Sequence, residues 1–202
     1  MEVTSMFRFD PTTADCTVRT FKEGPLAVLG YDLVLRVSRF AVDVDQRRGA
    51  IEARFDPGSI VVVGERRETG AEPALLPEAK RLTIERAIAA QVLEAARHRD
   101  IVFHSTYFVR RGECVEVLGR LTLHGREQPL GFLVAPQGDH FRAKARVYQP
   151  DFGITPYRML LGGLRVHPYV DVELKLPAAP ILGLEREAPI QAESPHLAVP
   201  PL

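Results

Sequence analysis

Six histidines are the residues of this sequence best suited to hold a metal ion or to move protons near neutral pH. A metal site built on one element usually places two histidines four residues apart on a helix or two apart on a strand. No pair has either spacing, and His98 and His104 would meet only if the fold happened to bring them together. We therefore predict no metal site and no histidine acid or base. The six are His98, His104, His124, His140, His167 and His196.

The two cysteines, Cys16 and Cys114, are the other candidate nucleophiles. A nucleophilic thiol needs a nearby base and a lowered pKa, and the sequence indicates neither. Cys16 has the same strand parity as Ala14 and Val18, which predicts a small core residue. Two cysteines are too few for a cysteine-ligated zinc site, and we expect no disulfide between them in a cytosolic chain.

Asp151-Phe152-Gly153 matches the metal-binding triplet of protein kinases. The Gly-rich phosphate loop and the catalytic His-Arg-Asp of that family are missing from the sequence, so the kinase interpretation is excluded. Gly153 instead predicts a tight turn in which Phe152 packs and Asp151 accepts backbone hydrogen bonds. We predict no catalytic residue, no cofactor and no enzymatic activity.

Three basic residues, Arg142, Lys144 and Arg146, occupy alternate positions of one expected strand and define a basic strand face. Such a face could attract phosphates or anionic lipid headgroups. The last expected strand offers Asp171 and Glu173 on its outer side, where adjacent antiparallel strands would pair them with these bases. We favour the solvated cross-strand network and keep membrane docking as the minor hypothesis.

Composition narrows the class of protein that must position these residues. The chain has 202 residues, of which 46% are hydrophobic, and this is enough for one substantial core. Lysines and arginines number 26, as do aspartates and glutamates, so the basic excess of a nucleic-acid-binding protein is missing. No apolar run is long enough to span a bilayer, and residues 1–10 show no secretory signal. We expect a cytoplasmic protein with no transmembrane segment and no nucleic-acid partner.

Apolar residues alternate with polar ones along most of the chain, as they do in half-buried strands. The clearest example is 141–147, and a parity change near Ser38–Arg39 predicts a bulge between two strand segments. One stretch, from about Pro77 to Arg97, has helical periodicity instead, with a possible break near Leu82–Thr83. The remaining expected strands are 7–10, 14–21, 33–37, 40–44, 51–55, 59–63, 101–106, 115–123, 130–134 and 166–176.

About eight alternating strands with short turns predict an all-β fold, an eight-stranded antiparallel barrel with one helical insertion. A barrel of this size either fills its interior or holds one small ligand. Ala143, Ala145 and Gly119 occupy inward positions, and no Trp is present to fill the centre. These small residues favour an apolar space, but they could equally accommodate the helix or the taper of the barrel. The pattern leaves both alternatives open.

Two segments fit neither strand nor helix. We predict a barrel domain over residues 1–176 and a disordered or loosely draped tail over 177–202, which contains six prolines and no periodic pattern. The loop from Met159 to Leu164 is apolar and carries two adjacent glycines. It could pack under the barrel, but we favour a role in gating a ligand or closing the barrel.

Six short stretches occur together in a familiar order. They are Gly30-Tyr31-Asp32-Leu33, Phe103-His104-Ser105-Thr106, Leu121-Thr122-Leu123-His124-Gly125, Asp151-Phe152-Gly153-Ile154, Thr155-Pro156-Tyr157 and Leu160-Leu161-Gly162-Gly163-Leu164. Over about residues 7–176 the chain thereby resembles the YceI-like family of lipocalin-like barrels. That resemblance implies an eight-stranded barrel with a helix near its mouth, and a polyisoprenoid lipid such as a quinone tail in its interior. Tyr31 stands where the family more often has His.

We therefore expect non-enzymatic binding or carriage of a long apolar lipid, either a polyisoprenoid or a quinone-type molecule. The competing hypothesis is a protein-interaction barrel with a filled core, which could form a homodimer or use the Pro-rich tail. An enzyme acting on a lipophilic substrate ranks last, because the assigned inward positions are nearly all apolar. The expected ligand-binding residues are Leu33, Leu35, Phe103, Leu121, Leu123, Phe132, Phe141, Ala143, Ala145 and Val172.

Overall fold

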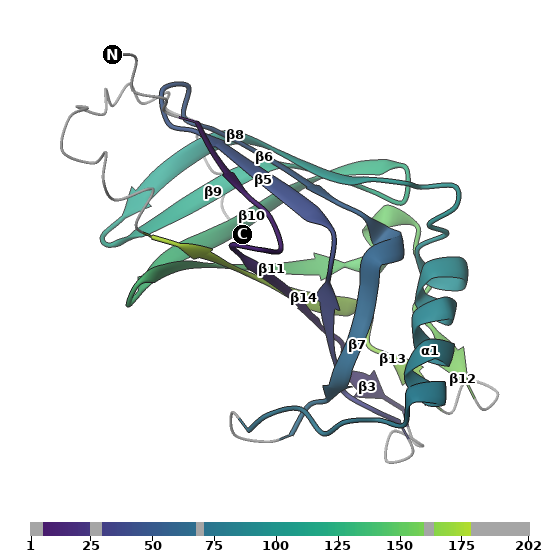
Figure 1. Cartoon of the computed structure of the whole chain (residues 1–202). Coiled ribbons are helices and arrows are strands. Elements are labelled where there is room, and N and C mark those ends of the chain that lie inside the picture. Colours follow the sequence, from purple (N-terminus) through teal and green to yellow (C-terminus); the bar gives the residue numbers. More distant parts are fainter. Residues whose placement is uncertain (1–5, 25–29, 68–70, 160–163, 179–202) are drawn as a thin grey trace.

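Two antiparallel sheets and one helical segment make up the part of the chain that the computed structural model describes, residues 6–24, 30–67, 71–159 and 164–178 (Figure 1). The larger sheet contains eleven strands and the smaller one contains three. The strands are β1 (Met6–Phe9), β2 (Asp15–Arg19), β3 (Lys22–Glu23), β4 (Leu33–Val37), β5 (Phe40–Asp45), β6 (Ala50–Phe55), β7 (Ile60–Glu65), β8 (Ile101–Arg111), β9 (Cys114–Leu123), β10 (Arg126–Gln137), β11 (His140–Tyr148), β12 (Arg158–Met159), β13 (Leu164–Val166) and β14 (Tyr169–Pro177).

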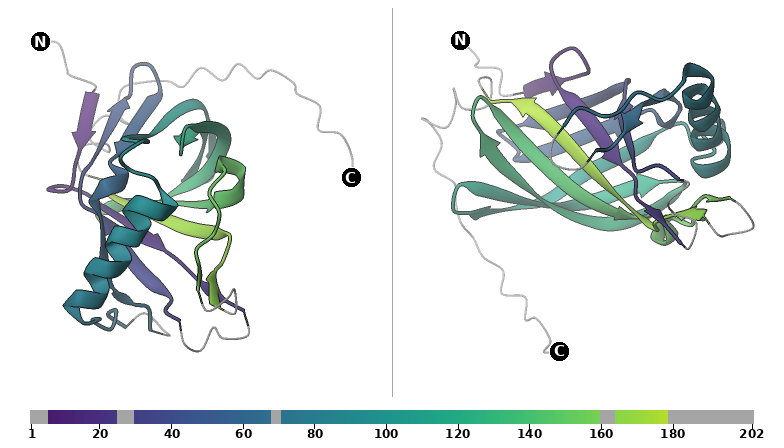
Figure 2. Two further views of the ribbon diagram at one scale, coloured as in Figure 1. Left: turned by 90° about the vertical axis from the view of Figure 1, so that its right-hand side faces the viewer. Right: turned by 90° about the horizontal axis from the view of Figure 1, so that it is seen from below.

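The large sheet has the strand order β1-β5-β6-β8-β9-β10-β11-β14-β2-β4-β7 and curls strongly (Figure 2). The predicted all-β, antiparallel class is confirmed, but this sheet has eleven strands where eight were predicted. The eleven strands nevertheless overlap the eleven segments in which alternation indicates strands. Two pairs of them, β4 with β5 and β6 with β7, are each one stretch of chain divided by a bend.

The two bends lie side by side. Ser38 N donates to Ser59 O and Asp56 N donates to Arg39 O, each at 3.0 Å. One bend is the predicted parity change between β4 and β5, and the other is a short 3-10 turn, Pro57–Ser59, between β6 and β7. Beyond the bends β5 pairs with β6, which pairs with β8, whereas β4 pairs with β2. The bent strands therefore carry the sheet round from β8 to β2 and shape the barrel.

Buried side chains form two clusters. The larger cluster lies inside the curled sheet and includes Phe9, Val42 and Val117, and the smaller one contains Leu35 and Val62. Cys16 also belongs to the larger cluster, which confirms the predicted core role. Burial raises the pKa of the Cys16 thiol to about 12, so the thiol stays protonated near neutral pH.

The tight turn predicted at Asp151-Phe152-Gly153 is present. Asp151 and Phe152 belong to a 3-10 turn, Gln149–Phe152, and Gly153 ends it with a left-handed φ of 73°. Phe152 is buried in the larger cluster, as expected. The strand β14 ends at Pro177, one residue past the predicted domain boundary, and Ala178 is buried as well. The rest of the predicted tail lies outside the described residues, as does most of the apolar loop from Met159 to Leu164.

The helical segment is shorter than the periodicity predicts. Helix α1 spans Glu78–Ala87 and continues into a π-helical turn, Ile88–Val92. Thr83 does not start a second helix, because its hydroxyl donates to Ala79 O one turn earlier (2.8 Å). The helix packs beside the edge strand β7, where the Val62 amide donates to Glu85 Oε1 (2.7 Å). Glu85 thus satisfies a backbone group that an edge strand would otherwise leave free.

Gly119 leaves room for the ring of Phe103 on the neighbouring strand. A Cβ at Gly119 would lie 2.3 Å from Phe103 Cζ and 2.4 Å from the backbone oxygen of His104. We expect Gly119→Ala to lower the free energy of unfolding by about 1–3 kcal/mol, because the strands must move apart. Urea denaturation measures this loss. Gly131→Ala is the matched control, since its Cβ would meet only the flexible tip of Leu118 closely, and an equal loss in both variants would contradict the explanation.

Candidate functional site

A cavity of about 480 Å³ occupies the inside of the curled sheet. It runs from Arg110 and Glu113, at the β8–β9 hairpin, to Leu93 and Ile101, next to the end of the helical segment. Apart from Arg110 and Glu113, every residue that lines it is apolar or a cysteine. We call this space the central cavity.

Strand alternation produces this apolar lining. On β11 the residues Phe141, Ala143, Ala145 and Val147 face the central cavity. Alternate residues of β14, opposite them in register, do the same, as Val172 does opposite Ala145. The intervening side chains point to the outer surface, because successive residues of a strand face opposite sides.

Eight of the ten expected ligand-binding residues line the central cavity, and two do not. The eight are Phe103, Leu121, Leu123, Phe132, Phe141, Ala143, Ala145 and Val172. Leu33 and Leu35 instead pack with Val62 in the smaller cluster. They share one face of β4 with Val37, which does line the cavity. Further along that face, the helical residues Ile84 and Ile88 cover them.

Sequence reasoning missed every lining residue on β5 and β6, for example Val42, Val44 and Ile51. Their signal was available, because they belong to the same alternating patterns that predict the strands. Leu93 had no such signal. It follows the π-helical turn, and the next residue, Glu94, has a left-handed φ of 45°.

A sequence profile described as the YceI-like domain matches residues 11–178. The chain belongs to the YceI-like family. Two solved structures have the same fold as this YceI-like chain. BcnA of Burkholderia cenocepacia is 14% identical with a TM-score of 0.56, covering 83% of this chain and 97% of its own. A domain of Saccharophagus degradans described as polyisoprenoid-binding and implicated in plant cell wall breakdown is 10% identical with a TM-score of 0.54, covering 86% and 97%.

A search of curated proteins found no match to this YceI-like chain. Within the described residues, no helix has both the length and the apolar character needed to cross a bilayer.

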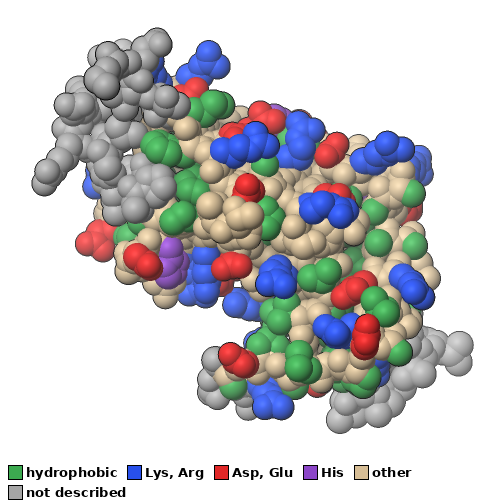
Figure 3. All heavy atoms as spheres, viewed as in Figure 1, with side chains coloured by type: hydrophobic (Ala, Val, Ile, Leu, Met, Phe, Trp, Pro, Cys, Tyr) green, Lys and Arg blue, Asp and Glu red, His purple; other side chains and the backbone are tan. Residues whose placement is uncertain are grey.

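Opposite charges are interspersed on the face of the YceI-like barrel that Figure 3 shows. The predicted pairing of the basic strand face with β14 is confirmed for two of its three bases. Arg146 forms a two-fold hydrogen bond with Asp171 (2.7 and 3.0 Å), and Arg142 donates to Glu173 Oε2 at 2.6 Å. Arg19, from β2, also donates to this carboxylate at 3.1 Å.

Glu173 is the exception to the predicted solvated network, since only 5% of its side chain is exposed. Burial by itself raises the pKa of this carboxyl. The hydrogen bond from Arg142 and the charge of Arg19 outweigh burial, and the pKa lies below its usual range. A carboxylate that remains charged while buried depends on both arginines.

Proposed function

We propose that this YceI-like barrel binds or carries a long apolar lipid, of polyisoprenoid or quinone type, without changing it chemically. The observation that supports the proposal is the central cavity, whose size of about 480 Å³ lies in the range of known ligand pockets. Its lining is apolar, and an apolar space of this kind suits a hydrocarbon better than water. The description of the S. degradans domain as polyisoprenoid-binding adds support.

The proposed mechanism is passive burial. Each methylene that leaves water contributes about 0.8 kcal/mol, so about ten of them contribute about 8 kcal/mol. This is the same order as the cost of fixing one molecule on another, which is roughly 4–15 kcal/mol. Measurable affinity therefore requires a long chain, and it should rise with each further isoprene unit that the central cavity accepts.

Binding is favoured over catalysis by the chemistry of the lining. Acid–base or nucleophilic catalysis needs an ionisable group at the reacting atoms. The groups of this kind in the central cavity are Arg110 and Glu113 at one end, and Cys16, whose raised pKa keeps it protonated. Arg110 and Glu113 are placed to meet the polar head of a ligand whose tail lies deeper.

The competing hypothesis, a protein-interaction barrel with a filled core, conflicts with a central cavity of this size. Homodimer formation does not depend on whether the barrel is filled, and the elution volume of the purified protein in size-exclusion chromatography would test it. We also propose a cytoplasmic location, and the two free thiols, Cys16 and Cys114, fit a reducing compartment. Fractionation of cells that express the native protein would test this location.

The proposed function predicts that lipid accompanies the protein from its own cells. We expect mass spectrometry of an organic extract of the purified native protein to detect a polyprenyl or quinone-type molecule at about one per chain. A globular protein purified by the same route is the control for carried-over membrane lipid. Recovery of no lipid, together with failure to take up added polyprenyl chains of several lengths, would overturn the proposal.

A further inference from the structure

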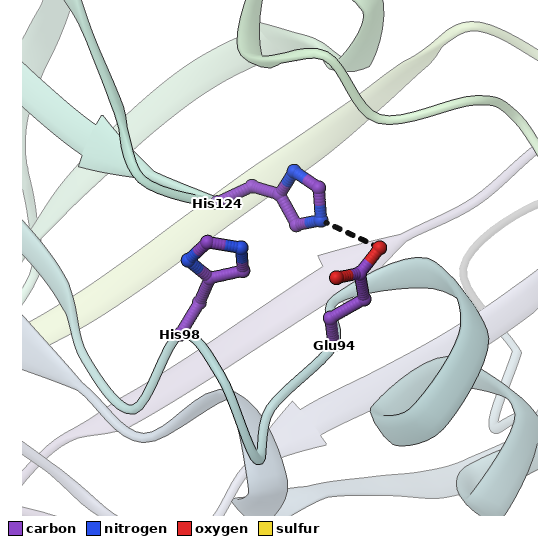
Figure 4. A group of neighbouring side chains, drawn as sticks. All are labelled: Glu94, His98 and His124. Atoms are coloured by element: carbon purple, nitrogen blue, oxygen red, sulfur yellow. Dashed lines mark ion pairs between the residues drawn. The ribbon is translucent and has the colours of Figure 1, made fainter.

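Three side chains with metal-binding atoms converge near the end of the helical segment (Figure 4), and none of them lines the central cavity. They are Glu94 and His98, from the turn that follows the helical segment, and His124, the first residue after β9. One ligand atom from each lies within 4.8 Å of the other two. The two imidazole rings are 4.4 Å apart between centroids, and His124 Nε2 lies 3.5 Å from Glu94 Oε1. We call these residues the Glu94–His98–His124 cluster.

His124 Nε2 is a buried nitrogen that lacks a hydrogen-bond partner among the described residues. Buried polar atoms are normally satisfied by the protein, by water or by a bound ion. This nitrogen is directed at the carboxylate of Glu94 but does not hydrogen-bond to it. A bound ion at this position would provide the partner that this nitrogen lacks.

The backbone holds the cluster in place. Glu94 and His124 are the residues other than glycine with a positive φ in the described ranges, at 45° and 53°. The amides of Arg97 and His98 both donate to Glu94 O (2.8 and 2.9 Å), which fixes the turn. Gly125 allows the close approach, because a Cβ there would lie 2.9 Å from His98 Cε1.

We propose that the Glu94–His98–His124 cluster is a binding site for a divalent transition-metal ion, most directly Zn²⁺. Two imidazole nitrogens and one carboxylate oxygen form a donor set that Zn²⁺ takes in proteins. Ligands about 2.1 Å from a tetrahedral ion lie roughly 3.4 Å from one another, so small side-chain rotations bring the three atoms into range. Three protein ligands leave a fourth position for water or an added ligand.

One neighbouring cation competes for the carboxylate. Arg97 Nη1 lies 3.7 Å from Glu94 Oε2, but 78% of the Arg97 side chain is exposed. Exposed pairs of this kind are weak, so the ion pair does not block a metal ion. The other carboxylate oxygen, Oε1, faces His124.

The position of the site ties it to the central cavity. Leu93 and Leu123 immediately precede Glu94 and His124, and both line the cavity. A metal ion here would fasten the end of the helical segment to the β9–β10 turn. It would thereby hold that end of the cavity in one conformation.

Zinc titration of the full chain after chelator treatment tests the proposal. We expect saturable calorimetric binding of one Zn²⁺ per chain, with a rise in Tm. His98→Ala should weaken binding at least tenfold. His124→Asn should do the same, and asparagine tolerates the left-handed backbone at this position. Circular dichroism verifies that both variants are folded. If one histidine still binds Zn²⁺ weakly when the other is replaced, the variant with both His98→Ala and His124→Asn should lose that remaining binding.

His104→Ala is the matched control, because His104 also lies beside a glutamate, Glu52, at 4.0 Å, but no second histidine joins this pair in the part of the chain that the structure describes. It should bind Zn²⁺ like the parent. The absorption spectrum with Co²⁺ in place of Zn²⁺ gives a second readout. Co²⁺ bound by nitrogen and oxygen atoms lacks the charge-transfer band that a thiolate ligand produces. The spectrum therefore distinguishes binding at the cluster from binding at Cys114. No saturable binding, unchanged affinity in both cluster variants, or a thiolate band would each overturn the proposal.

Discussion

Ala145→Phe is expected to expel lipid from the barrel while leaving the barrel folded, and Ala143→Phe is expected to act in the same way. Both alanines face the central cavity from β11, where a phenyl ring would occupy space assigned to the ligand. Displacing two methylenes removes about 1.6 kcal/mol, and displacing more removes proportionally more. Affinity for an added polyprenyl chain should fall at least tenfold. Lipid per chain in organic extracts and fluorescence titration both measure the change.

Ala135→Phe is the matched control for these two variants. Ala135 lies on the neighbouring strand β10, opposite Arg142, and is not part of the cavity lining. The same substitution there adds the same ring to the outer face, so lipid binding should not change. Full lipid load in both Ala143→Phe and Ala145→Phe would mean that the ligand does not occupy the central cavity.

Glu173→Ala should cost about 2 kcal/mol of the free energy of unfolding, because it removes hydrogen bonds between a buried carboxylate and two half-buried arginines. Arg142 and Arg19 would both lose this carboxylate, of which 5% is exposed. Asp171→Ala is the matched control, because Asp171 lies two residues before Glu173 on the same face of β14. Its carboxylate is 33% exposed, and its pair with Arg146 should contribute less than about 1 kcal/mol.

The Glu173 pair also predicts a pH dependence. The pKa of this carboxyl is lowered in the folded protein, so its contribution to stability is complete above the unfolded pKa, about 4.3. The contribution disappears as the pH falls from there through the lower folded value. Glu173→Gln should lose this part of the acid dependence of urea denaturation. Equal stability losses for the Glu173 and Asp171 variants, or an unchanged acid profile, would refute the assigned role.

Local alternation made much of the barrel predictable. The pattern at 141–147 predicts a strand and four side chains on its inner face, all of which line the cavity. This prediction needs no knowledge of the partner strand, because side chains of a strand must alternate. The parity change at Ser38–Arg39 likewise indicated a bend. Short-range rules of this kind do not depend on what the strand packs against.

The same rules were insufficient at Leu33 and Leu35. Alternation correctly places both residues on the inner face with Val37. It gives no information about Ile84 and Ile88, which cover them. The helical segment also ended early, because a left-handed residue, Glu94, interrupts it where the periodicity continues. Coverage of a face is decided by segments that are distant in the sequence.

The sequence by itself determined an antiparallel β protein with alternating apolar faces, since these properties follow from the spacing of neighbouring residues. Only the tertiary structure decided that those faces enclose a cavity and that Glu94, His98 and His124 meet. Both outcomes depend on where the bent strands and the helical segment come to rest. That placement results from packing between distant parts of the chain, which no local pattern encodes.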